Sequence, residues 1–103
     1  MADALLPDEC AAQLRVLSEP ERLRILQLLL MGPHAVSAIA DVLDASVALT
    51  SHHLSVLKRE GYVRATKSGR QVIYEVDKDR FVQTGRNQKP RVSLGCCVLQ
   101  FPS

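Results

Sequence analysis

The sequence predicts a single, mainly α-helical domain that carries a small β-hairpin. Its 103 residues match the size of one domain, and 47% hydrophobic with 23% charged residues is the composition of a globular protein. Apolar residues recur at helical spacing up to Glu60 and alternate with polar ones after Gly61. Their period therefore changes from about 3.6 residues to about 2, which places the helices first in the chain and the strands after them.

Two helices are expected in the first third of the chain. The first covers residues 8–17. Ser18 and Glu21 then have the spacing of a capping box, in which a serine hydroxyl and a glutamate carboxylate each accept a hydrogen bond from a backbone N–H. The second helix, which this box opens, is expected to end at Gly32-Pro33, because proline cannot continue it.

A pair of short helices joined by a tight turn is expected next. The third helix covers about residues 35–43 and the fourth about residues 46–60, so that residues 44–45 form the turn. Ser46 can cap the fourth helix, which is expected to end at Gly61. The inner face of the fourth helix is expected to consist of Thr50, Leu54 and Leu57.

A β-hairpin is expected after the helices. Residues 63–66 and 72–76 alternate between apolar and polar side chains, which is the pattern of two half-buried strands. Between them, residues 67–70 form a short loop, in which Gly69 can adopt a positive φ at no steric cost.

The end of the chain is predicted to be less regular. Residues 77–84 are expected to add a helical turn or two, and residues 85–90 to form a linker. Residues 92–101 are apolar and suit a strand better than a helix. The expected organisation is therefore a helical and hairpin domain over residues 1–84, followed by a linker and a cysteine-containing tail over residues 85–103.

Two short helices joined by a turn and followed by a basic hairpin are the winged helix-turn-helix arrangement. In it, the second helix lies in the major groove of DNA and the hairpin reaches neighbouring phosphates. The net charge is −4 over residues 1–46, +3 over residues 47–80 and +3 over residues 81–103, and this asymmetry favours a surface that faces a polyanion. The residues expected to face DNA are Ser46, Ala48, Leu49, Ser51, His52, Ser55 and Arg59 of the fourth helix and Lys67 and Arg70 of the hairpin.

Four segments make the resemblance to a known family specific. Residues 17–26 (LSEPERLRIL) are similar to the opening motif of the ArsR/SmtB family of bacterial repressors. Residues 51–57 (SHHLSVL) resemble its recognition-helix signature, and residues 61–63 (GYV) and 69–74 (GRQVIY) resemble its turn and wing. The resemblance covers about residues 10–80. It implies a homodimeric repressor that leaves double-stranded operator DNA, an imperfect palindrome, when a metal, a metalloid or another inducer binds.

The chain departs from two patterns of that family. Ala35 and Ser37 occupy the positions where many members carry cysteines at the start of the third helix. No histidine follows His53, so the paired Asp/His site of other members is missing as well. The C-terminal dimer helix is expected to be truncated or replaced by the tail.

The cysteines remain as candidate ligands. Their odd number and the lack of C-x-x-C spacing argue against a disulfide scaffold, a zinc ribbon or a thioredoxin-type motif. In an extended strand, the adjacent Cys96 and Cys97 would point to opposite faces, one of them as a packing residue. If Gly95 bends the chain, both sulfurs converge, and trivalent arsenic or antimony favours three sulfurs in a pyramid. We therefore interpret Cys96 and Cys97, with Cys10 as a third ligand, as a metalloid site, and the packing role stays open.

These observations lead to one hypothesis and two alternatives. The hypothesis is a DNA-binding repressor that arsenite or antimonite releases from its operator, with no obligatory cofactor. The first alternative is a repressor of the same fold that senses oxidants or reactive sulfur. Because a disulfide between adjacent cysteines strains the peptide between them, that version favours pairing with Cys10 or across the dimer. The second alternative is a small thiol-carrying binding protein whose helix-turn-helix contacts proteins, and the basic hairpin argues against it.

Other classes of protein are not expected. His52 beside Ser51 or Ser55 lacks the carboxylate and oxyanion features of a hydrolytic site, so we expect no enzyme. The longest apolar run, residues 28–31, is far shorter than the roughly 20 residues that span a bilayer. No signal peptide is expected either, and a cytoplasmic location follows.

Two packing predictions complete the sequence-based picture. Leu14, Leu17 and the apolar tail need a covering surface, so we expect them at or near the interface of a homodimer. His53 is expected to pack against the hairpin as a structural histidine.

Overall fold

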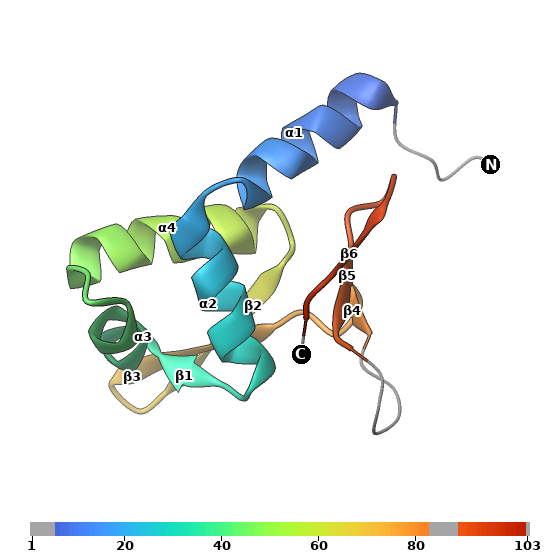
Figure 1. The fold of residues 1–103 in the computed structure, drawn as a ribbon. Helices are drawn as coiled ribbons and strands as arrows, with labels where there is room; N and C mark the ends of the chain where they lie inside the picture. The colour runs from blue at the N-terminus through green and yellow to red at the C-terminus, as the bar shows by residue number, and fades with distance from the viewer. Residues whose placement is uncertain (1–5, 83–88, 103) are drawn as a thin grey trace.

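A computed structural model describes residues 6–82 and 89–102 and confirms a mainly α-helical fold with a β-hairpin wing (Figure 1). The helices are α1 (Pro7–Leu17), α2 (Pro20–Leu30), α3 (Val36–Leu43) and α4 (Val47–Arg59). The strands are β1 (His34–Ala35), β2 (Val63–Ser68), β3 (Gln71–Val76), β4 (Phe81–Val82), β5 (Arg91–Ser93) and β6 (Val98–Gln100). Within the described residues, every helix is too short or too polar to cross a membrane.

The elements lie at two ends of the molecule around α2. Figure 1 shows α3 and the sheet of β1, β2 and β3 at one end. The sheet of β4, β5 and β6 stands at the other end, next to α1. The first helix and the turn between β5 and β6 are therefore neighbours in space.

The boundary between α1 and α2 differs from the predicted one. Ser18 follows α1, and its hydroxyl donates a hydrogen bond of 2.8 Å to the carbonyl oxygen of Arg15. Glu19 is the N-cap of α2, and Pro20 is its first residue. The prediction of a capping box at Ser18 is wrong, because this hydroxyl bonds to the Arg15 carbonyl, which also accepts the N–H of Ser18, instead of to an N–H of α2.

The predicted helix-turn-helix consists of α3 and α4. Asp44 ends α3 in the left-handed region, with a φ of 53°, which aspartate tolerates better than most residues. α3 begins at Val36, one residue later than predicted, because His34 and Ala35 pair with Tyr74 and Ile73 of β3 as a short strand. Two residues are too few to produce a strand pattern in a sequence.

The first sheet has the strand order β1-β3-β2 and contains the predicted hairpin, which we call the wing (residues 63–76). Its strands pair antiparallel from Val63 opposite Val76 to Ser68 opposite Gln71. The loop is shorter than predicted, because residues 67 and 68 belong to β2. Gly69, in the two-residue turn that remains, has a φ of 62°.

The tail forms a second sheet, with the order β4-β5-β6, that the sequence did not predict. The expected single strand over residues 92–101 is a hairpin, closed by a hydrogen bond of 2.9 Å from the N–H of Leu94 to the carbonyl oxygen of Cys97. Phe81 pairs with Val92, so a strand replaces part of the helix expected over residues 77–84. The expectations for residues 83–88, and the domain boundary at residue 84, lie outside the described residues.

The second sheet packs into the same core as the helices. Val92, Leu94 and Phe101 are at most 4% exposed and share one apolar cluster with Leu17 of α1. Leu17 and these residues of the tail are therefore buried within one chain, and their place at or near a dimer interface stays a prediction. Leu14 remains 49% exposed.

We expect Phe101→Ala to lower the free energy of unfolding by about 3 kcal/mol, because it removes a large buried side chain from the core. Val82→Ala is the control at an exposed apolar position of the same sheet, and we expect a change within about 0.5 kcal/mol. Urea unfolding of the two variants measures both values. Equal effects would contradict the packing of the tail into the core.

Candidate DNA interface and thiol cluster

The outer face of α4 is uncovered. All the residues predicted to face DNA from this helix are exposed except Ser51, which is partly buried. The exposed residues are Ser46, Ala48, Leu49, His52, Ser55 and Arg59. The Ser46 hydroxyl accepts a hydrogen bond of 3.0 Å from the N–H of Leu49 and so caps the helix as predicted. A capped helix with an uncovered outer face can approach base edges in the major groove.

The inner face of α4 fixes its orientation. Thr50, Leu54 and Leu57 have no exposed surface, as predicted, and the two leucines belong to the apolar core. The Thr50 hydroxyl donates a hydrogen bond of 2.9 Å to the carbonyl oxygen of Ser46, which satisfies its polar group inside the protein. The helix therefore cannot rotate without exposing core residues.

The tip of the wing carries two exposed basic side chains. Lys67 lies opposite Val72 near the end of the hairpin, and Arg70 lies in the turn itself. Arg64, further from the tip, forms an ion pair of 3.3 Å with Glu75 across the strands. Lys67 and Arg70 are thus the wing cations that are open to a phosphate backbone.

His53 is buried and has a hydrogen-bond partner in α2. Its packing against the hairpin stays a prediction. His53 is 6% exposed, and its Nδ1 atom accepts a hydrogen bond of 3.2 Å from Nε of Arg22. Burial lowers the pKa of His53, and the Arg22 guanidinium lowers it further. Because an imidazole nitrogen can accept from arginine only when it carries no proton, this contact needs the neutral ring.

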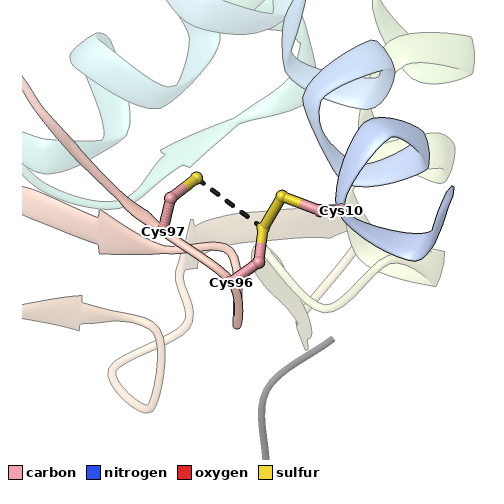
Figure 2. Close-up of side chains that lie close together, drawn as sticks. All are labelled: Cys10, Cys96 and Cys97. Atoms are coloured by element: carbon pink, nitrogen blue, oxygen red, sulfur yellow. Dashed lines mark hydrogen bonds between the residues drawn. A yellow bond between two sulfur atoms is a disulfide. The ribbon is translucent and has the colours of Figure 1, made fainter. Parts of the chain in front are cut away.

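The three cysteines form one cluster at the end of the molecule opposite α3. Cys10 lies near the start of α1, and Cys96 and Cys97 lie in the turn between β5 and β6 (Figure 2). A disulfide joins Cys10 and Cys96, whose Cα atoms are 5.7 Å apart. The Cys97 sulfur is 3.7 Å from that of Cys96, and all three sulfurs lie within 4.8 Å of one another.

The local backbone explains why the sulfurs converge. Gly95 has a φ of 96°, and its N–H donates a hydrogen bond of 3.2 Å to the Ser93 hydroxyl. This turn brings the adjacent sulfurs toward α1 instead of leaving them on opposite faces of a strand. Residues 10 and 96 are far apart in the sequence and close in space, and their disulfide is the pairing with Cys10 that the oxidant-sensing alternative favours.

Three residues that the sequence analysis did not single out lie beside this cluster. Tyr62 is fully buried, and its hydroxyl donates a hydrogen bond of 2.6 Å to Oε1 of Gln13. The guanidinium of Arg80 lies 4.4 Å from the centre of the Tyr62 ring. Burial raises the pKa of Tyr62, Arg80 opposes this, and Glu60 and Cys97 add to the rise. The one local signal for this network is a tyrosine directly after the glycine that ends α4.

Known proteins share this arrangement. The profile of the family "Bacterial regulatory protein, arsR family" matches residues 19–65. The cadmium resistance transcriptional regulatory protein CadC of Listeria innocua is 44% identical over 61 residues, which are 58% of this chain and 51% of that protein. The chain thus spans about half the length of this curated relative.

Two solved structures resemble the chain as well. The homodimeric winged helix-turn-helix DNA-binding domain of Mb0332 from Mycobacterium bovis is 33% identical, with a TM-score of 0.64, and the match covers 70% of this chain and 67% of that one. A candidate transcriptional regulator for arsenical resistance is 40% identical, with a TM-score of 0.62, and the match covers 65% of this chain and 70% of that one.

The fold and the open face of α4 define a winged helix-turn-helix domain of the DNA-binding type. The chain belongs to the arsR family of bacterial regulatory proteins, as the resemblance in its sequence predicts. The similar proteins are described as transcriptional regulators and not as enzymes.

The His53–Arg22 contact gives a pH dependence with a definite sign. Below the ordinary value of 6.5, His53 takes up a proton in the unfolded chain while its lowered pKa keeps it neutral in the folded one. The folded state therefore loses stability as the pH falls through 6.5 toward the lowered pKa.

We expect His53→Gln to flatten this acid limb, since glutamine offers an acceptor to Arg22 and does not titrate. Thermal unfolding between about pH 7.5 and pH 5 measures the effect, with the exposed His52→Gln as control. An unchanged acid limb in His53→Gln would show that other groups cause it.

Proposed function

We propose that the chain is a transcriptional repressor that binds double-stranded operator DNA as a homodimer. The open outer face of α4 supports base contacts, and the exposed Lys67 and Arg70 support phosphate contacts. The relative from Mycobacterium bovis is a homodimeric DNA-binding domain. A two-fold dimer presents its recognition helices about 34 Å apart and so fits an imperfect palindrome. Because bacterial operators lie in the cytoplasm, this function implies a cytoplasmic protein.

Exposed apolar side chains offer a surface for the second subunit. Leu14 of α1 and Val98 and Leu99 of β6 are 49%, 60% and 36% exposed. Their elements adjoin the thiol cluster, where the disulfide joins α1 to the turn before β6. Covering these side chains would lower the free energy of the dimer through apolar burial.

The inducer that we propose is trivalent arsenic or antimony, bound by Cys10, Cys96 and Cys97. The observation that supports it is the convergence of three sulfurs within 4.8 Å. Thiolates are soft ligands that select thiophilic ions, and a pyramid of three sulfurs suits a trivalent metalloid. Among the similar proteins, one is described as a regulator for arsenical resistance and another as a regulator of cadmium resistance.

The chemistry of binding requires the reduced cluster. A reductant adds two electrons and two protons to the Cys10–Cys96 disulfide and gives two thiols. Arsenous acid then exchanges its three hydroxyl groups for three sulfurs, and the three thiol protons leave with them as three molecules of water. The ligated cluster holds α1 and the β5–β6 turn in a different geometry from the disulfide.

The disulfide itself favours a second candidate, a repressor that responds to oxidants. A hydroperoxide would oxidise one thiol to a sulfenic acid, and the second thiol would displace water to form the Cys10–Cys96 disulfide. The two thiols lose two electrons and two protons, and the peroxide is reduced. In this version, Cys96 pairs with Cys10 and not with its neighbour, which avoids the strain of an adjacent pair.

We expect Arg70→Ala to weaken binding to operator and random duplexes alike, and to flatten the slope of log K against log salt by about one. His52→Ala should instead reduce discrimination between the two duplexes by about tenfold, which is about 1.4 kcal/mol. Fluorescence anisotropy across a salt series measures both effects. Arg91→Ala, exposed on β5, is the control. An Arg70→Ala protein with unchanged affinity for every duplex would remove the wing from the interface.

We expect the double variant Cys96→Ser, Cys97→Ser to bind the operator normally and to lose its release by arsenite. Cys10→Ser should weaken the release, since two of three ligands remain. Operator binding is measured in a thiol-free reductant, with and without arsenite. If the double variant still leaves the operator on addition of arsenite, the cluster is not the inducer site.

The same variants separate the two candidates. Hydroperoxide should release the wild type and the Cys97→Ser variant if the Cys10–Cys96 disulfide is the signal. Release by arsenite in the reduced protein, without release by hydroperoxide, favours the metalloid.

A further inference from the structure

We propose that Tyr62 is the residue that couples the thiol cluster to α4 and the wing. This inference rests on the proposed function in one respect, since it assigns the route by which an inducer at the cluster acts on the DNA interface. The cluster has two halves, Cys10 on α1 and the pair Cys96 and Cys97 in the turn between β5 and β6. Contacts lead from each half to one buried tyrosine.

The first half of the cluster reaches Tyr62 through α1. Cys10 and Gln13 lie one helical turn apart on this helix, so a displacement of one displaces the other. Gln13 accepts the Tyr62 hydroxyl at 2.6 Å with Oε1 and donates from Nε2 to Glu60 at 3.1 Å. The Glu60 carboxylate also forms an ion pair of 3.3 Å with Nε of Arg59, which is one of the residues predicted to face DNA.

The second half of the cluster reaches Tyr62 through Arg80. The Arg80 guanidinium lies 4.4 Å from the centre of the tyrosine ring and donates a hydrogen bond of 3.2 Å to the carbonyl oxygen of Ser93. The Ser93 hydroxyl in turn accepts a hydrogen bond from the N–H of Gly95, which directly precedes the two cysteines of the turn. The Arg80 side chain also lies against the backbone just before Tyr62, since a Cβ atom added at Gly61 would be 3.3 Å from Nε of Arg80.

The backbone of Tyr62 joins these contacts to the DNA-binding elements. Its N–H donates a hydrogen bond of 2.9 Å to the carbonyl oxygen of Leu57, which ties it to the last turn of α4. Its carbonyl oxygen accepts a hydrogen bond of 3.0 Å from the N–H of Asp77, the residue after β3. Tyr62 also directly precedes β2. A shift of the tyrosine therefore moves the end of α4 and the base of the wing together.

Coupling between two sites requires an element with different positions in two states. The cluster has at least two such states, since a disulfide holds two sulfurs in a bond and a metalloid holds three sulfurs around an added atom. The ring of Tyr62 has no exposed surface, so the core transmits its displacement instead of absorbing it in solvent.

The test compares the wild type with Tyr62→Phe, which keeps the buried ring and removes the bond to Gln13. Tyr74→Phe, in β3, is the matched control for the loss of a tyrosine hydroxyl. Hydrogen exchange is measured in the disulfide form, the reduced form and the reduced form with arsenite. Operator affinity is measured in the reduced form with and without arsenite.

In the wild type, we expect a change of state at the cluster to alter hydrogen exchange in α1 and in the tail. We also expect a change in residues 57–63, which run from the last turn of α4 to the first residue of β2. Tyr62→Phe loses the bond to Gln13 but keeps the contact between Arg80 and the ring, so the change at residues 57–63 should become smaller. An arsenite effect of at least about tenfold on operator affinity should fall below about threefold. Operator affinity without arsenite should stay within about twofold of that of the wild type, which is about 0.4 kcal/mol. Tyr74→Phe should respond as the wild type does.

The outcomes separate this inference from the proposed inducer. If exchange at residues 57–63 changes more in the wild type than in Tyr62→Phe, and arsenite releases neither, the coupling stands and the inducer is another agent. If Tyr62→Phe transmits the change as fully as the wild type, or if residues 57–63 never respond in the wild type, the coupling role is overturned. Should Tyr62→Phe fail to fold, Gln13→Met on the partly buried side of α1 decides by the same criteria.

Discussion

The burial of one face of α4 is the constraint on which the rest of the structure depends. Leu54 and Leu57 have no exposed surface, and α2, α3 and β2 all pack against this helix. Because the inner face is buried in the core, the opposite face must point to solvent. The packed side chains also prevent the helix from rotating about its axis. A helix that reads DNA needs such a fixed orientation, since base recognition depends on the placement of a few side chains.

The helical part of the fold could be predicted because its signals are local and repeated. The core-facing residues of α4 recur at helical spacing, Ser46 precedes the helix as its cap, and Gly61 follows its end. The alternation in residues 63–76 likewise predicted two paired strands, although the burial along β3 does not alternate and Val72 is 38% exposed. Each of these patterns repeats over several residues, so a single misread position does not change the result.

The second sheet and the thiol cluster could be predicted only in part because their determinants are distant in the sequence. β5 and β6 have three residues each, too few to show a period of two. Their pairing depends on Phe81 and on contacts with α1, which lies some 80 positions away in the chain. The convergence of Cys96 and Cys97 could be considered from Gly95, but the place of Cys10 depends on the fold.

The bond between Cys10 and Cys96 encloses a segment of 86 positions, which is most of the chain. In its oxidised form, the protein therefore contains one large covalent loop that runs from α1 to the turn between β5 and β6. A closure of this length lowers the entropy of the unfolded chain enough to stabilise the fold by about 4–5 kcal/mol in the chain-entropy description. A change of that size alters the fraction of unfolded molecules available to proteases by about a thousandfold, since each 1.4 kcal/mol is a factor of ten. The redox state of one bond would then set how long the protein persists, independently of what it binds.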